Sequence, residues 1–278
     1  MVSCLAQYKF EGNLQDSIGS FPLTGSGHSF GSTAKEGSKS VDLNASNSYL
    51  SAGTMNLGEV FTISLWLNSS NFSNLRTIIS NSASDTGNGF VVWLNDYTKD
   101  NRQLVLGTGS SGFSWSLTQE NVITDGQWEH LVLVINKTSG YGKFYLNNSE
   151  LPWSSSNFNS NVITDGKELR FGICLNGQWD SHCLFDDIQI YDGELSASEV
   201  SFLHNNPGSI ISSTQVESLS GTSAGSSNSS GNLKGLNSIS GSIESISSTQ
   251  GNLKGISSLF GTILSSTISN GILKARVK

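Results

Sequence analysis

The sequence is poor in cysteine, proline and charge. Its 278 residues include three cysteines, three prolines and four histidines, and 13% are charged, with a formal net charge of −7. Three cysteines form at most one intrachain bridge, which excludes a disulfide framework. An acidic chain with no basic block does not suit a nucleic acid, because proteins bind the phosphate backbone through clustered Lys and Arg.

Long apolar runs are also missing. No stretch is long enough to span a bilayer as a helix, and the opening residues MVSC lack a basic segment followed by a hydrophobic one. These features predict a soluble protein without a signal peptide. The length exceeds what one core usually organises, so we expect one large domain and a smaller second one.

What the first two hundred residues do contain is a series of short apolar segments separated by Asn, Ser, Gly and Asp. The most apolar is 128–136, WEHLVLVIN, in which both sets of alternate residues are largely apolar. A strand with this pattern is expected to lie buried between two layers. The β-pattern resumes at 144–146 after a polar break with two glycines, which predicts a hairpin.

Further β-segments follow one another with no helix between them, at 4–10, 40–43, 48–51, 60–67, 76–79, 90–94, 103–106, 113–117, 169–174 and 184–191. Such a succession predicts an all-β sandwich rather than a parallel sheet with crossover helices. One helix is expected, from Ala197 to His204. Ser196 and Glu199 stand at its start with the spacing of a capping box.

The order of five motifs carries a family resemblance: QYKFEG at 7–12, FTISLW at 61–66, DGQWEH at 125–130, FYLN at 144–147, and FDDIQIY at 185–191 before LSASEV. With them, residues 1–205 resemble the laminin G-like branch of the concanavalin A-like lectin/glucanase superfamily. The resemblance implies a two-sheet antiparallel jelly-roll sandwich with one short C-terminal helix. Relatives often hold calcium at a loop rim. No Asp-rich loop with that spacing occurs here, so we expect no cofactor, and calcium remains possible by family analogy only.

The superfamily includes sugar-binding modules, protein-binding modules and hydrolases. A glycosidase needs two carboxylates that flank the scissile bond. The nearest acidic pair is Asp186 and Asp187, and neighbours on a strand point to opposite faces, so we expect one buried and one exposed Asp and no catalytic site. Asp180, His182 and Cys183 supply too few ligands for a metal site, and none is expected.

The tryptophans provide the candidate binding residues. Trp66, Trp93 and Trp128 lie in apolar strands and are expected in the core. Trp153 and Trp179 lie in polar segments, and an aromatic face beside amides and hydroxyls suits a sugar, although loop tryptophans also simply cap sandwich ends. The candidate ligand-binding residues are therefore Trp153, Trp179, Asn157, Asn176 and Asp180.

Cys174 and Cys183 bound a polar turn, and the strands on either side could pair as a hairpin. That arrangement would bring the two sulfurs close enough for a disulfide. Two reduced thiols are the alternative if the protein is assembled in a reducing cytoplasm. The sequence leaves both states open for this pair and for Cys4.

Beyond a short linker at 206–209, the composition changes to Ser, Gly, Ile, Leu and Asn. The motif GNLKG at 231–235 recurs at 251–255, and GILKA follows at 271–275, a period of 20 residues with further glycines midway. Each ten-residue unit is expected to form one short strand and a turn. Units this small must stack on neighbours or on other copies, so 210–278 is predicted to be a repetitive β domain for docking or oligomerisation.

These repeats resemble the tails of bacteriophage and prophage fibre and decoration proteins. The two resemblances together imply a non-enzymatic virion surface protein, a tail fibre or capsid decoration protein, assembled in the host cytoplasm. Its expected partners are a host cell-surface glycan, other virion structural proteins and further copies of the chain, with a trimer favoured, and neither nucleic acid nor an inserted membrane. The alternatives are an extracellular or cell-surface bacterial adhesin or secreted carbohydrate-binding lectin, and a glycoside hydrolase with an unrecognised site.

Overall fold

The computed structural model describes residues 2–84, 86–97 and 99–211, and, beyond these, five short strands between 219 and 260. The chain divides into two compact units, Met1–Ile211 and Ser212–Lys278. Each unit is described separately below.

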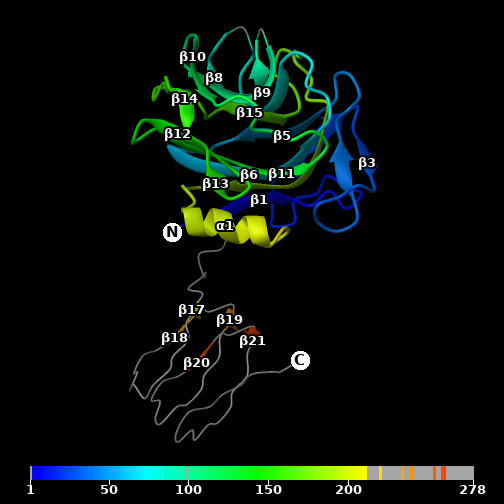
Figure 1. Cartoon of the computed structure of the whole chain (residues 1–278), viewed down its shortest axis with the longest axis vertical. Coiled ribbons are helices and arrows are strands. Elements are labelled where there is room, and N and C mark those ends of the chain that lie inside the picture. Colours follow the sequence, from blue (N-terminus) through cyan, green and yellow to red (C-terminus); the bar gives the residue numbers. More distant parts are fainter. Residues whose placement is uncertain are drawn as a thin grey trace, which may run out of the picture. The chain divides into compact units, whose positions relative to one another are not determined.

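The first unit is a sandwich of two antiparallel sheets with eight strands each (Figure 1). Sheet A has the order β13 (Ser149–Glu150), β12 (Tyr141–Leu146), β11 (Trp128–Asn136), β6 (Val60–Ser69), β16 (Cys183–Tyr191), β4 (Ser40–Asp42) and β3 (Ser29–Gly31), with β1 (Cys4–Tyr8) also paired to β16. Sheet B has the order β14 (Trp153–Ser155), β10 (Phe113–Thr118), β9 (Lys99–Gly109), β8 (Gly89–Asp96), β7 (Arg76–Ser80), β15 (Lys167–Phe171), β5 (Tyr49–Met55) and β2 (Thr24–Ser26). This architecture confirms the predicted fold class.

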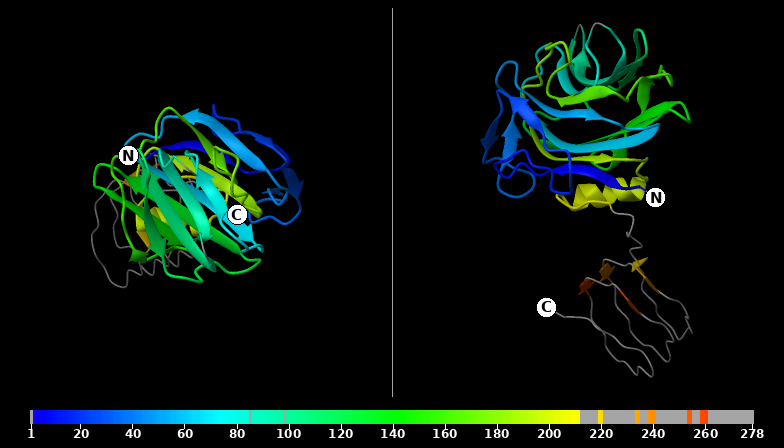
Figure 2. Two further views of the ribbon diagram at one scale, coloured as in Figure 1. Left: turned by 90° about the horizontal axis from the view of Figure 1, so that it is seen from above. Right: turned by 180° about the vertical axis from the view of Figure 1, so that it is seen from behind.

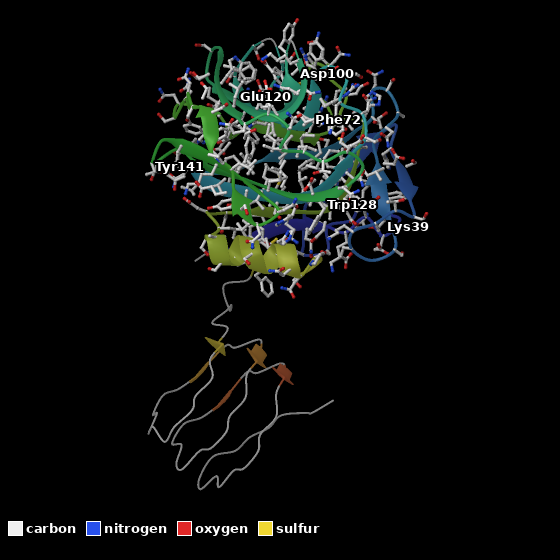
Figure 3. All side chains as sticks on the ribbon, viewed as in Figure 1. Lys39, Phe72, Asp100, Glu120, Trp128 and Tyr141 are labelled. Atoms are coloured by element: carbon white, nitrogen blue, oxygen red, sulfur yellow. The ribbon has the colours of Figure 1, made fainter. Side chains whose placement is uncertain are left out.

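Strand β11 is an inner strand of sheet A, between β12 and β6. One set of its alternate residues, including Leu131 and Leu133, is fully buried in the main core. The other set, Val132 and Val134, packs in a second cluster with residues of the helix. The predicted burial between two layers is confirmed, and so is the hairpin to β12, which carries the chain from Trp128 to Tyr141 at the opposite end of the sandwich (Figure 3).

The single helix among the described residues, α1 (Ala197–Asn205), covers the outer face of sheet A, as the rear view in Figure 2 shows. It begins at Ser196, whose hydroxyl accepts from the Glu199 N–H while the Glu199 carboxylate accepts from the Ser196 N–H. The predicted capping box is therefore confirmed. In the part of the chain that the structure describes, no helix has the length and apolar character needed to cross a bilayer.

The prediction for the acidic pair on β16 is wrong. Asp186 and Asp187 are both buried, because a register shift between Asp186 and Gln189 interrupts the alternation and Asp187 adopts a φ of 41°. The Asp186 carboxylate accepts from the N–H groups of Lys35 and Glu36, yet burial raises its pKa to about 7. Both aspartates thus serve to hold the ends of neighbouring loops.

The segment 206–209, expected to be a linker, is fixed to the first unit. The Gly208 N–H donates to Asp187 at 2.7 Å, and its carbonyl accepts from the Gln7 amide at 2.9 Å. Ile211 is buried, and its N–H donates to the Tyr191 hydroxyl. The first unit therefore extends to residue 211, where the chain divides.

In the second unit, the described strands pair in parallel with a register of one 20-residue repeat. Strands β17 (Leu219–Ser220), β19 (Ser238–Ser240) and β21 (Ser258–Phe260) form one sheet, in which Leu219 pairs with Ile239 and Ile239 with Leu259. Strands β18 (Leu233–Lys234) and β20 (Leu253–Lys254) form another. The repeat at 271–275 lies outside the described residues.

Candidate functional site

The outer face of sheet B carries an apolar cluster that is separate from the core between the sheets. Val91 and Trp93 of β8, Val105 of β9 and Trp115 of β10 belong to it or pack against it. The alternate residues of the same strands, such as Val92 and Leu104, belong to the main core. Strands β8 and β9 are therefore apolar on both faces, although their outer face is not covered by another sheet.

The aromatic rings of this cluster pack closely. Trp93 and Trp115 are stacked with centroids 4.8 Å apart and an interplanar angle of 26°, and Phe113 lies 4.8 Å from Trp115. The Trp115 ring approaches β9 closely because residue 107, its partner in the ladder, is a glycine. A Cβ at Gly107 would stand 2.5 Å from the Trp115 ring, closer than atoms can approach.

Trp179 joins this cluster from the loop between β15 and β16. Its carbonyl accepts from the Thr77 N–H at 2.9 Å, which attaches the loop to β7, and its φ of 64° is rare for a tryptophan. Its ring meets that of Tyr97 edge-on at 5.9 Å. Tyr97 is 70% exposed, which is unusual for a large aromatic side chain and leaves its ring available to a ligand.

Together these side chains line a cavity of about 490 Å³, within the range typical of small-molecule sites. The lining residues are Ser84, Trp93, Asn95, Asp96, Tyr97, Val105, Trp115, Leu117, Gln178 and Trp179. The cavity thus combines aromatic faces with a small number of polar side chains.

The polar groups of the cavity differ in how far they are already used. The Ser84 hydroxyl donates to Gln178 Oε1 at 2.6 Å. The Asn95 amide donates to the Asn74 carbonyl and accepts from the Arg102 N–H, so it is held within the protein. The Trp93 indole N–H is buried and has no hydrogen-bond partner among the described residues.

The structure separates the residues that the sequence proposed as a site. Trp179 lines the cavity, and Asn176 lies at its rim, where its amide donates to Ser84 at 2.9 Å. Asp180 accepts from the Asn47 N–H, and its carbonyl accepts from Arg76. These three residues belong to one loop.

Trp153 and Asn157 are not brought to this cavity. Trp153 packs against Phe144, 5.3 Å away, and its indole donates to the Gly142 carbonyl, so it belongs to the margin of the core. The Asn157 N–H donates to the Ser116 hydroxyl. Neither residue lines the cavity.

The three cysteines form no disulfide within the described part of the chain. The Cys174 sulfur lies 3.3 Å from the Thr77 hydroxyl, and the Cys183 thiol donates to the Ser181 carbonyl. Burial raises the pKa of Cys183 to about 12. Of the two states left open by the sequence, the structure contains the reduced thiols.

Sequence reasoning missed Trp93, Trp115 and Tyr97 as members of a surface site. Trp93 was expected in the core, and it is buried, but it packs on the outer face of sheet B. The available signal was the run of strands that are apolar on both faces, with five tryptophans from 93 to 179. Among the described residues, no group of three His, Cys, Asp or Glu could hold a metal ion, so this part of the chain offers no metal site as an alternative to the cavity.

Comparison with known proteins agrees with this architecture. Residues 43–201 match the family described as the concanavalin A-like lectin/glucanases superfamily. The first unit is a lectin-like jelly roll, and the chain belongs to this family.

Among curated proteins, the chain is 24% identical over 171 residues to adhesion G-protein coupled receptor V1 of Danio rerio. The match covers 58% of this chain and 2% of that receptor, so it concerns a small part of the receptor.

Similar solved structures share the fold. Domain 4 of AbnA, an extracellular GH43 arabinanase from Geobacillus stearothermophilus in complex with arabinotriose, has a TM-score of 0.56 at 23% identity over 73% of this chain and 98% of that one. The botulinum neurotoxin serotype G binding domain has a TM-score of 0.54 at 19% identity over 73% of this chain and 50% of that one. The binding domain of Paraclostridial Mosquitocidal Protein 1 has a TM-score of 0.56 at 18% identity, covering 73% and 52%.

Proposed function

We propose that the first unit is a non-catalytic glycan-binding domain and that the sugar binds in the aromatic cavity on the outer face of sheet B. The observation that carries the proposal is the meeting of Trp179 and Tyr97 with the stacked pair Trp93 and Trp115 around one cavity.

The physical basis is the amphipathic shape of a pyranose or furanose ring. Its C–H face buries apolar area against an aromatic ring, while its hydroxyls exchange hydrogen bonds with polar groups at the edge. Here Gln178 and Ser84 line the same cavity as Trp179 and supply polar groups beside its ring. The cavity therefore matches the two kinds of surface that a sugar presents.

Several similar structures are described as binding domains or as complexes with a ligand. One similar structure is described as a domain in complex with arabinotriose, and others are described as toxin binding domains. Similarity at these identities carries the fold and not the ligand, so the cavity itself is the argument for a sugar in this chain.

Replacement of Trp179 by Ala tests the proposal. Loss of one aromatic contact should weaken binding by roughly 1–3 kcal/mol, about fivefold to more than a hundredfold in Kd. Binding is measured on a glycan array and then by calorimetry with the strongest hit. Trp128→Ala serves as the matched control, because Trp128 is half-buried, lies on sheet A and does not line the cavity (Figure 3).

The result that would overturn the site is equal Kd for the wild type and Trp179→Ala with an unchanged melting temperature. Loss of binding in Trp153→Ala alone would transfer the site to the edge strand β14, the other position that the sequence suggested. Absence of glycan binding by the wild type would overturn the function.

We also propose a setting for this domain, the surface of a bacteriophage particle, where the chain attaches the virion to a host glycan through the first unit. The support is the repeat sequence of the second unit, which resembles the tails of phage fibre and decoration proteins. The described strands of this unit pair with one another at the same 20-residue interval. The second unit would dock onto other virion proteins or join three copies of the chain.

Sedimentation of the full chain and of residues 2–211 tests the role of the second unit. A trimer of the full chain beside a monomer of the shorter one is expected. If both the full chain and residues 2–211 sediment as monomers, the proposed self-association is wrong. If mass spectrometry does not find the protein in purified particles, the proposed phage setting is wrong. A cell-surface adhesin is the second candidate, favoured by the match to an adhesion receptor.

A further inference from the structure

The side chains that line the cavity on sheet B carry negative charge only. Among its described lining residues, Asp96 is the single charged side chain, and no Lys, Arg or His lines the cavity. A site of this kind offers nothing to neutralise an acidic sugar.

The cations nearest to Asp96 in the sequence are engaged elsewhere. Lys99 forms an ion pair with Glu120 at 3.4 Å, and the Arg102 guanidinium lies 4.5 Å over the Phe72 ring. No ion pair to Asp96 forms within the described residues. One Asp96 oxygen, Oδ1, accepts from the Tyr97 N–H at 2.7 Å, which fixes the carboxylate beside the exposed Tyr97 ring.

The surroundings carry an excess of negative charge, since Asp96, Asp100 and Glu120 outnumber Lys99 and Arg102. Asp100 and Glu120 both lie on the side of the domain formed by sheet B (Figure 3), and the chain as a whole has a formal net charge of −7. The Asp100 carboxylate accepts from the Asn74 N–H, and Glu120 carries the ion pair with Lys99. A second anion in the cavity would meet repulsion, and a cation would meet attraction.

The aromatic rings favour the same ligand. The face of a Trp or Tyr ring attracts an ammonium group, and this attraction is strongest where water is partly excluded. The cavity presents Trp179 and Tyr97 beside the Asp96 carboxylate, so one ligand cation can contact both a ring face and an anion.

We propose that this cavity selects sugars by charge: it prefers a glycan that carries a free ammonium group, such as glucosamine units, over the neutral N-acetylated equivalent, and it rejects glycans that carry carboxylates. The proposal rests on the proposed glycan-binding function of the same cavity and adds the class of sugar.

Calorimetry with three probes of similar length tests the selectivity. The probes are a glucosamine trimer, an N-acetylglucosamine trimer and a galacturonic acid trimer, each at low salt and at pH 6. A ligand cation held by one partly exposed carboxylate and one aromatic face should bind about threefold to tenfold tighter than its neutral equivalent. That ratio should fall as salt is added, because screening weakens exposed charge pairs.

The Asp96→Asn variant isolates the cause, since its side chain keeps an oxygen that can accept from the Tyr97 N–H. In this variant the ratio of the two affinities should approach one. Asp100→Asn is the matched control, because Asp100 lies on the same side but does not line the cavity, and its ratio should remain that of the wild type.

The outcomes separate the two proposals. Equal affinity of the wild type for the ammonium and N-acetyl trimers, or tighter binding of the acidic trimer, would overturn the charge selectivity and leave the glycan site in place. An unchanged ratio in Asp96→Asn would also overturn it. Absence of binding for all three probes and for the full glycan array would overturn the glycan-binding function itself.

Discussion

At the scale of single residues, burial sets the chemistry of several titratable groups. His130 is 1% exposed beneath α1 and packs in a cluster with the rings of Trp66 and His204, whose centroids lie 4.9 and 5.6 Å from its own and 5.4 Å from each other. Its Nε2 lies 2.8 Å from the Ser64 hydroxyl, and its Nδ1 has no partner among the described residues. Burial, with His204 and Lys35 adding repulsion, lowers the pKa of His130 to about 3.

This lowered pKa predicts a loss of stability in acid. The unfolded chain binds a proton at His130 below a pKa of about 6.5, while the folded protein does not bind it until near pH 3. The contribution of His130 is therefore fully present above pH 6.5 and is lost as the pH falls, by up to about 1.4 kcal/mol per pH unit.

Comparison with His130→Gln measures this effect, because carboxylates that titrate in both proteins cancel in the difference. Urea unfolding at pH 7 and pH 4.5 should show that the free energy of unfolding falls more in the wild type than in the variant. Parallel changes in the two proteins would contradict the lowered pKa.

At the scale of elements, the floor of the cavity depends on the close approach of β10 to β9. The substitution Gly107→Val should displace Trp115, because any Cβ at this position would stand 2.5 Å from the ring. Overpacking of this kind costs about 1–3 kcal/mol in free energy of unfolding, and the displaced ring should also weaken glycan binding.

Near-ultraviolet circular dichroism, which reports on the packing of tryptophans, and the glycan Kd measure the change. The matched control is Gly140→Asn, at a turn glycine with no atom near its missing Cβ and a φ of 74° that Asn tolerates. Wild-type spectra and affinity in Gly107→Val would show that Trp115 does not form the floor of the site.

For helix α1, in contrast, signals that are local in the sequence are enough to predict the element. Ser196 and Glu199 form the cap that their spacing predicts, and the helix ends one residue beyond the expected His204. Its placement on sheet A follows from Val200 and Leu203, which pack on the outer side of β11.

At the scale of the whole molecule, the first unit needs the residues that follow its helix. A chain that ends at 205 lacks the Gly208 N–H that donates to the buried Asp187 carboxylate, and it lacks the buried Ile211. Removal of a donor from a buried acceptor costs about 1–3 kcal/mol, and loss of the Ile211 side chain adds to this.

Residues 2–211 and 2–205 should therefore both give β-type circular dichroism spectra, but the longer chain should unfold cooperatively at the higher urea concentration. Equal midpoints would show that 206–211 contribute no net stability. A helical or non-cooperative product from 2–211 would contradict the independent folding of the first unit.

The sequence by itself determined the features that depend on neighbours along the chain. Alternation identified β11 and its hairpin, and capping chemistry identified α1. These follow from backbone periodicity and from hydrogen bonds between near neighbours, which a reader of the sequence can count. The order of motifs also pointed to the correct family.

The tertiary structure alone decided which apolar face of sheet B remains uncovered, and so where the candidate site lies. Phe90, Val92 and Leu94 alternate with Val91 and Trp93, and nothing local distinguishes the set that meets sheet A. The bulge at Asp187 likewise depends on pairing with distant strands and on donors from Gln7 and Gly208. Trp179 meets Trp93 and Tyr97 only because folding brings together segments more than eighty residues apart, and such a contact leaves no periodic signal in the sequence.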